Sequence, residues 1–455
     1  MTKRARTVPQ AALAIALCGC LGACATYKSL PLPAGPDLAT SAARLKVDVS
    51  RLRLGPLEAH RFDPAGGLDP TDIAILAVLN SPDLQAKRAL AKVAAAQAFS
   101  AGLLPDPQLA LSADIPDHPA GLVTAYGITP TIDLLGLVTQ STALKAARAS
   151  AKQADLDLLW SEWSAAQQAR QLTVTAMADE AKADILRAIA QGMDARYRKT
   201  RGALAAHDVT LLTTSADLAA KLDADAQLAT AARDAAKARG DLNALIGLAP
   251  GARLNLVAGP PAVVPSAASL DAALDALPRR RPDLLALQAG YRAQDANLRK
   301  AILSQFPVVN LGYSRQRDTG AILTNGLTAT LVVPIFSRGR GDIAIQSATR
   351  ARLKAEYQAR IDQTVADVAQ ARRDRDADAA TLVRLEARVP ELLAQLDEAR
   401  RAADRGDIDS AAFLALEQSA LRQRVALLDL RLALALADIS LDTVLFLPSD
   451  QGATP

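Results

Sequence analysis

The chain has 455 residues, with 52 lysine and arginine residues against 48 aspartate and glutamate residues and a formal net charge of +4. So small a positive excess gives no reason to expect a nucleic-acid partner. Aromatic residues make up only 3% of the chain, which excludes a conventional core built on Phe, Trp and Tyr. Abundant alanine alongside leucine, arginine and acidic residues indicates long, closely packed helices.

The first 23 residues have the layout of a secretory signal. Lys3, Arg4 and Arg6 precede an apolar run at 11–17, and small residues follow it. The run is too short to cross a membrane as a helix, which needs about 20 apolar residues. Residues 1–23 are therefore predicted to be a signal peptide, and their removal takes away three basic residues, leaving 49 basic against 48 acidic side chains.

All the cysteines of the chain, Cys18, Cys20 and Cys24, lie at this end. The motif Leu-Gly-Ala-Cys that ends at Cys24 resembles a bacterial lipobox, in which the cysteine is acylated and becomes the first residue of the mature protein. An ordinary signal peptide is the alternative, and Cys20 is a weaker candidate for acylation. Ala25, rather than an aspartate, follows Cys24 and favours sorting to the outer membrane. No cysteine follows, which excludes disulfides and cysteine-ligated metals from the rest of the chain.

Helices dominate the remainder of the chain. Residues 24–70 are rich in proline and glycine and predict an extended strap. Beyond it, capping residues, proline positions and apolar spacing predict helices over 81–101, 136–206, 209–246, 341–404 and 408–446. The three- and four-residue spacing of apolar side chains over 382–396 is typical of a coiled coil.

Four segments between these helices alternate apolar and small polar residues. They are 108–116, 121–129, 308–315 and 327–333. This alternation is typical of membrane barrel strands, although a half-exposed hairpin on a soluble domain has the same period. Tyr126 and Tyr313 are the main candidates for an interfacial aromatic belt. Four strands cannot close a barrel in a bilayer, so spanning strands require an oligomer, and three copies give twelve strands.

The two halves of the chain resemble each other. "NSPDLQAKRAL" at 80–90 matches "RRPDLLALQAG" at 280–290, and "AHDVTLL" at 206–212 matches "RGDIDSA" at 405–411. These matches predict one helix–β-hairpin–long helix–helix unit used twice.

Six segments follow from this pattern. They are a signal peptide at 1–23, a lipid-anchored extended strap at 24–70, a first repeat at 71–250 with its β-hairpin at 107–133, a linker at 251–268, a second repeat at 269–448 with its β-hairpin at 307–336, and a tail at 449–455.

These features together resemble the outer-membrane factors of the TolC family. The resemblance rests on the lipobox, the duplicated Pro-Asp-Leu helix start, the hairpin before each long helix, Pro-Ile-Phe-x-x-Gly at 334–339 and the Gly-Asp-Ile turn at 406–408, and it covers about 68–448. It implies a mainly α fold with a small β part, assembled as a homotrimer with a twelve-strand β-barrel in the outer membrane and an α-helical barrel in the periplasm. Such proteins are passive exit ducts that dock onto a periplasmic adaptor and an inner-membrane pump and export drugs, metal ions or proteins.

In this resemblance, the turns at 205–211 and 405–411 form periplasmic tips that meet the adaptor and ring the aperture. The residues carried over are His207, Asp208, Gly406, Asp407 and Asp409. Helix capping is the alternative role of the aspartates, and an ordinary surface position is the alternative for His207.

In the helix after the second turn, Glu417 is the first acidic residue beyond the tip. The sequence therefore does not predict an acidic gate in the first turn of that helix. Asp407 and Asp409 are therefore the favoured charge ring. Gly192 and Pro390 stand at similar depths in the two long helices and predict a shared bend.

Enzyme chemistry is not predicted. The chain has no glycine-rich phosphate loop, no HExxH and no nucleophile elbow, and His60 and His118 are too isolated for a metal site. No cofactor is expected. Two alternatives to a small-molecule efflux duct remain open, a type I protein-secretion duct and a non-pore periplasmic coiled-coil scaffold lipoprotein. The cargo, the cognate adaptor and pump, and the gating residues also stay open.

Overall fold

A computed structural model describes residues 27–446 except 59, 63, 118–120 and 260–266. The chain divides into two compact units, Met1–Leu38 and Ala39–Pro455. In the first unit, residues 27–38 form no helix or strand and their side chains are exposed. The predicted signal peptide, Cys24 and the tail at 449–455 lie outside the described residues.

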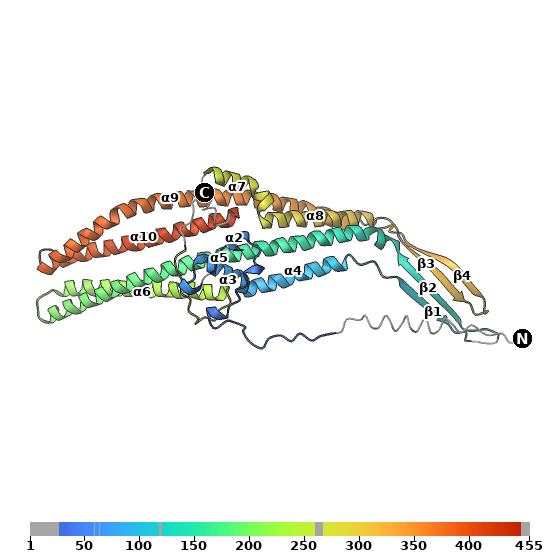
Figure 1. Ribbon diagram of the computed structural model, residues 1–455, viewed down its shortest axis with the longest axis horizontal. Helices are drawn as coiled ribbons and strands as arrows, with labels where there is room; N and C mark the ends of the chain where they lie inside the picture. The colour runs from blue at the N-terminus through green and yellow to red at the C-terminus, as the bar shows by residue number, and fades with distance from the viewer. Residues whose placement is uncertain (1–26, 59, 63, 118–120, 260–266, 447–455) are drawn as a thin grey trace. The chain divides into compact units, whose positions relative to one another are not determined.

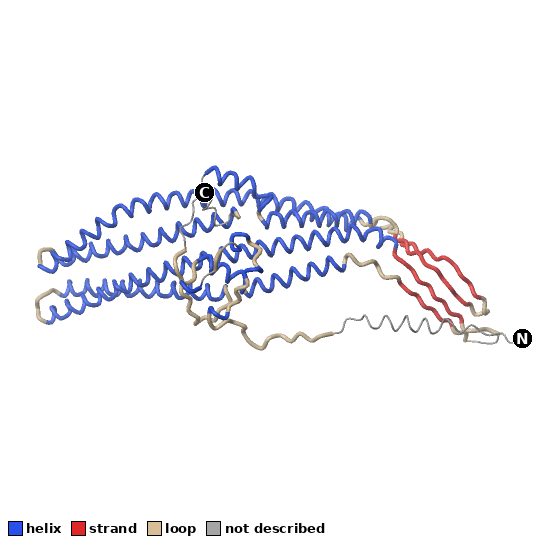
Figure 2. Tube along the Cα trace, viewed as in Figure 1, coloured by secondary structure: helices blue, strands red, loops and turns tan. Residues whose placement is uncertain are grey.

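The second unit is mainly helical (Figures 1 and 2). Its main helices are α3 (Pro70–Asn80), α4 (Pro82–Ser100), α5 (Leu134–Ala205), α6 (Leu211–Leu245), α7 (Ala267–Arg280), α8 (Pro282–Leu303), α9 (Arg340–Arg405) and α10 (Ser410–Leu445). The five helices predicted from the sequence are present, each with ends within two residues of those expected. Proline stands at the first helical position of α4 and of α8. A backbone N–H at that position would have no acceptor within the helix, so its loss in proline costs little.

Four antiparallel strands form one sheet in the order β1-β2-β3-β4. They are β1 (Gln108–Asp114), β2 (Ala125–Asp133), β3 (Val308–Arg317) and β4 (Leu323–Val332). Pairing of β2 with β3 joins the two hairpins into one layer, which lies at one end of the second unit (Figure 2). β2 begins and ends four residues later than the expected strand at 121–129. Its ladder with β3 runs on to Asp133, and the alternation of apolar and polar residues is weakest in this segment.

The predicted strap at 24–70 differs from the structure beyond residue 38. The described residues of 39–70, which leave out 59 and 63, include short helical turns such as α2 (Gly55–Glu58) and join a compact core around α3. The leucines they contribute are Leu45, Leu52, Leu54, Leu57 and Leu68. Sequence periodicity could not reveal this core, since α3 is buried on all sides and such a helix lacks a polar face.

Two long helix pairs make up most of the second unit. α6 runs back along α5, and α10 runs back along α9, with both turns at the end away from the sheet (Figure 1). On α5, four buried alanines recur every seven residues, at Ala169, Ala176, Ala183 and Ala190. A seven-residue repeat keeps one face of a helix against its neighbours, and small side chains there let the helices approach closely. This packing explains how the chain forms a core with so few aromatic residues.

Across the residues that the structure describes, no helix is both long enough and apolar enough to cross a membrane.

Candidate functional site: an exposed sheet and two helix turns

The four-stranded sheet has one apolar face and one small polar face. Residues paired across antiparallel strands point to the same side, and the pairs Leu111↔Ile128, Ile132↔Leu311 and Tyr313↔Leu327 define the apolar side. The opposite side carries Gln108, Ser112, Thr129, Thr131, Asn310, Gly312, Ser314, Thr324, Thr328 and Thr330. The alternation predicted from the sequence is therefore sorted consistently across all four strands.

The apolar face is open to solvent in a single chain. Leu111 is 70% exposed and Leu327 is 91% exposed, and the tyrosines Tyr126 and Tyr313 are also exposed. Contiguous exposed apolar surface of this kind marks contact with a membrane or with another protein.

Both edges of the sheet are also open within the described part of the chain. β1 pairs only with β2, and β4 pairs only with β3. The outer sides of these strands present unpaired N–H and C=O groups, which template pairing with another strand. Another strand could therefore extend the sheet at either edge.

The two helix turns have the same backbone conformation. His207 has φ of 64° and Gly406 has φ of 79°, both in the left-handed region. The N–H of Asp208 donates to Ala203 O at 2.9 Å, and the N–H of Asp407 donates to Ala402 O at 2.8 Å. This is the six-to-one bond of a common helix C-terminal motif, which normally needs glycine. The unusual backbone angles predicted for Gly406 are present, and His207 adopts them too.

Helix capping does not account for the aspartates of these turns. Thr210, not Asp208, caps α6, with its hydroxyl accepting from the N–H of Thr213 at 3.2 Å. Asp409 stands at the cap position of α10 but makes no capping hydrogen bond. Asp407 instead accepts a bond from Arg405 Nε at 2.7 Å. All three carboxylates are exposed and face solvent at the turns.

Two exposed leucines at the first turn were missed by the sequence reasoning. Leu211 is 70% exposed and Leu212 is 81% exposed at the start of α6. The signal was available, because two adjacent apolar residues on a helix cannot both face the same partner. The second turn has Ser410 and Ala411 at the matching sequence positions, so its sequence lacks this leucine pair.

Gly192 and Pro390 both lie inside continuous helices. Gly192 stands 13 residues before the end of α5, and Pro390 stands 15 residues before the end of α9. A shared bend at these positions stays a prediction.

Glu417 connects the turn region to the helix pairs. It pairs with Arg400 at 3.7 Å and is largely buried. Burial raises the pKa of Glu417, while Arg400 and Arg196 oppose that rise. Arg196 itself bonds Asp217 on α6 at 2.8 Å and lies over the ring of Phe413. These contacts tie α5, α6, α9 and α10 together near the turns.

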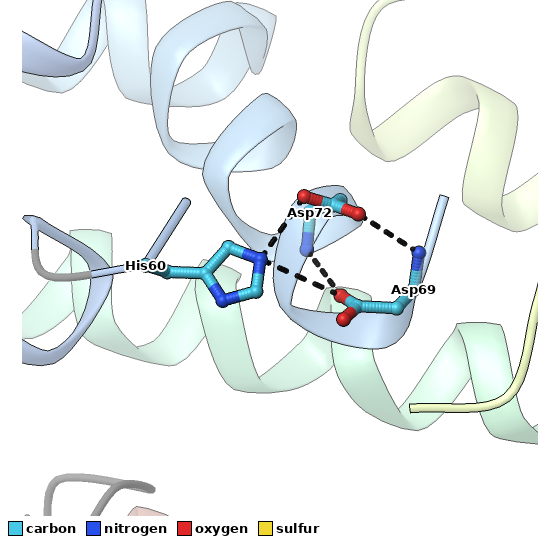
Figure 3. Close-up of side chains that lie close together, drawn as sticks. All are labelled: His60, Asp69 and Asp72. Carbon is cyan, nitrogen blue, oxygen red and sulfur yellow. Dashed lines mark hydrogen bonds and ion pairs between the residues drawn. The ribbon is translucent and has the colours of Figure 1, made fainter. Parts of the chain in front are cut away.

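His60 is not isolated, contrary to the sequence expectation. Its Nε2 lies 3.1 Å from Asp72 Oδ1 and 4.0 Å from Asp69 Oδ1 (Figure 3). These three residues offer ligand atoms within 4.8 Å of one another. Asp69 and Asp72 already form the capping box of α3, and the positive end of a helix disfavours a cation. The arrangement therefore serves to hold residue 60 against the start of α3. His118 lies outside the described residues.

Comparison with solved structures identifies the fold. The outer membrane channel CmeC of Campylobacter jejuni matches with a TM-score of 0.70 and 14% identity, over 93% of this chain and 94% of CmeC. VceC, an outer membrane protein of Vibrio cholerae, matches with a TM-score of 0.67 and 18% identity, over 83% of this chain and 95% of VceC. The open state of the MtrE outer membrane channel of Neisseria gonorrhoeae matches with a TM-score of 0.65 and 17% identity, over 82% and 88% of the two chains.

The chain therefore shares its fold, a small sheet with long helices, with solved outer-membrane channels. The predicted resemblance to the TolC-family outer-membrane factors is confirmed at the level of the fold. Searches of protein-family models and of curated proteins found no match.

Proposed function

We propose that this chain forms, as a homotrimer, the outer-membrane exit duct of a tripartite efflux system. The observation that carries the proposal is the sheet, with one exposed apolar face and two open edges, on a fold shared with outer-membrane channels. Three copies joined edge to edge make a closed twelve-strand barrel, which leaves no unpaired backbone in the bilayer. Strands of seven to ten residues approach the 9–11 residues that a tilted membrane strand needs.

The helices supply the periplasmic part of the proposed duct. α5 has 72 residues, which is roughly 110 Å of helix at 1.5 Å per residue. The order helix, two strands, long helix, helix occurs twice, as α4 to α6 and as α8 to α10. A duplicated unit of this kind, repeated in three chains, gives twelve long helices around one lumen and an α-helical barrel continuous with the strands.

The helix turns are the proposed contacts with a periplasmic adaptor, which links the duct to an inner-membrane pump. His207, Gly406 and the exposed carboxylates of Asp208, Asp407 and Asp409 lie at the end away from the sheet. In this arrangement the carboxylates ring the aperture. The resemblance implies drugs or metal ions as cargo, conducted passively.

Acylation of Cys24 is the proposed anchor in the outer membrane. After signal cleavage, its acyl chains add to the affinity for the bilayer by about 0.8 kcal/mol for each buried methylene. Replacement of Cys24 with serine is expected to abolish incorporation of labelled palmitate.

Alternating cysteine labelling tests the duct against the scaffold. Leu327 lies on the apolar face, and Thr328 lies on the polar face and is partly buried in the single chain. In proteoliposomes, Leu327→Cys is expected to resist a water-soluble maleimide until detergent is added, whereas Thr328→Cys reacts through the lumen. A non-pore scaffold gives the opposite order, because Leu327 is the more exposed of the two in an isolated chain.

A further inference from the structure

The apolar face of the sheet ends in two arginines. In the ladder, Arg315 pairs with Ile128 and Asn325, and Arg317 pairs with Tyr126 and Leu323. Cross-strand partners share a face, so both arginines project from the apolar side. They lie at the hairpin end of β3, away from the helices (Figure 2). We call Arg315, Arg317, Tyr126 and Asn325 the basic rim.

The guanidinium groups of the basic rim have no carboxylate partner among the described residues. Neither Arg315 nor Arg317 forms an ion pair with another described residue, and Arg315 is exposed. The nearby Asp318 carboxylate is used in the β3–β4 turn, where it accepts a bond from the N–H of Ile322 at 2.9 Å. Two positive charges on an apolar surface therefore lack a counter-charge from the part of the chain that the structure describes.

The positive charge of the four strands is confined to one face and one end of the sheet. On the polar face at the same level, Gln316 pairs with Thr324, and both are neutral. At the helix end of the apolar face, Val309 pairs with Leu331. A ligand that pairs with both arginines must therefore carry a negative charge. It must also carry apolar groups, next to that charge, that cover the apolar face of the sheet.

We propose that the basic rim binds the phosphorylated headgroups of lipids in the leaflet at the hairpin end, which is the outer leaflet of the outer membrane. The proposal rests on the proposed function, which places the apolar face against the bilayer. The apolar stem of an arginine side chain can lie along apolar surface while its guanidinium group reaches the membrane interface. The guanidinium group forms bidentate hydrogen bonds to phosphate oxygens. Tyr126, in the basic rim, and the neighbouring Tyr313 are residues of the type found at membrane–water interfaces.

Lipid binding by the full-length protein tests this proposal. The protein is placed in phosphatidylcholine nanodiscs with added lipid A or with dephosphorylated lipid A, and bound lipid is counted by native mass spectrometry. We expect wild type to prefer the phosphorylated lipid. Arg315→Gln/Arg317→Gln is expected to weaken that binding about 25-fold, because each arginine contributes about 5-fold. Arg315→Lys/Arg317→Lys keeps the charge and retains part of the preference.

Matched controls separate a site from a general charge effect. Arg422→Gln/Arg424→Gln removes the same charge from exposed positions on α10 and is expected to bind like wild type. Inorganic phosphate is expected not to compete, because it lacks the acyl chains that contact the apolar face. Competition by inorganic phosphate would overturn the assignment to a lipid.

If wild type and Arg315→Gln/Arg317→Gln insert equally and also bind the phosphorylated lipid equally, that result would overturn the assignment of a lipid site to the basic rim. Insertion is read separately, from protection of Leu327→Cys against the water-soluble maleimide in the same nanodiscs. If Leu327→Cys is not protected in the wild-type background, the proposed function fails, and the basic rim fails with it.

Discussion

At the residue scale, the same backbone conformation is carried by glycine in one helix turn and by histidine in the other. Gly406 and His207 both have positive φ, which costs an L-residue about 1 kcal/mol or more but costs glycine little. Sequence comparison of the two halves placed these residues in register and identified Gly406 as a turn residue. It could not show that His207 takes the strained angles, because histidine tolerates many conformations.

Substitution of Gly406 tests this conformation. Gly406→Ala is expected to lower the stability of the α9–α10 turn by about 1 kcal/mol and to speed amide hydrogen exchange there. His207→Gly should change stability by about 0.5 kcal/mol or less, since relief of strain is opposed by the added freedom of the unfolded chain.

The control is Gly240→Ala in α6, where a Cβ meets nothing within 4 Å and φ is not positive. Alanine should stabilise that helix by about 0.8–1.0 kcal/mol. Equal effects of Gly406→Ala and Gly240→Ala would contradict a strained turn.

Glu417 predicts a dependence of stability on pH. Its pKa is raised above 4.5 by burial. Below 4.5 the carboxyl is protonated in both the folded and the unfolded state, and its stabilising contribution is full. As pH rises through the raised pKa, folding must bury an ionised carboxylate, and the contribution is lost. Glu417→Gln removes this titration, so the thermal midpoint of wild type minus that of the variant should fall from acid to neutral pH.

Other acids with raised pKa values, including Asp157 and Asp442, are present in both proteins and cancel in that difference. A difference that does not change with pH would show that Arg400 fully offsets the burial of Glu417.

At the scale of elements, the long helices were predictable and the small buried ones were not. Stretches of sixty or seventy residues with so few prolines and glycines leave few alternatives to a helix, and the ends of α5 and α9 fall close to those expected. α3 is apolar on every side and lies within a proline-rich region, so it carries no helical period to read. Leu52, Leu54 and Leu57 became core residues through tertiary packing that local sequence does not encode.

The alanine repeat of α5 offers a test of how its helices pack. Ala176 is fully buried, so Ala176→Leu inserts three heavy atoms into a filled contact and is expected to cost about 1–3 kcal/mol. Ala195→Leu, at an exposed position on the same helix, should change stability by less than about 0.5 kcal/mol. Thermal unfolding followed by helical circular dichroism compares the two, and similar midpoints would contradict a close-packed alanine face.

At the scale of the whole molecule, the residues that the structure describes leave an apolar sheet face exposed and two sheet edges open. Alternation in the sequence predicted both faces, because the strand period is two. The alternation could not exclude a half-exposed hairpin on a soluble domain, because such a hairpin has the same period of two as a membrane strand. The consistent sorting of four strands depends on the register between β2 and β3, which joins residues nearly two hundred positions apart and is visible only in the fold.

The mass of the detergent-extracted protein, measured together with its conductance in a planar lipid bilayer, shows whether the chain forms a trimeric duct. We expect a particle of three chains that conducts ions, even weakly, with the sheets of the three chains forming its barrel. A particle of one or two chains without conductance would contradict it and would leave a non-pore scaffold.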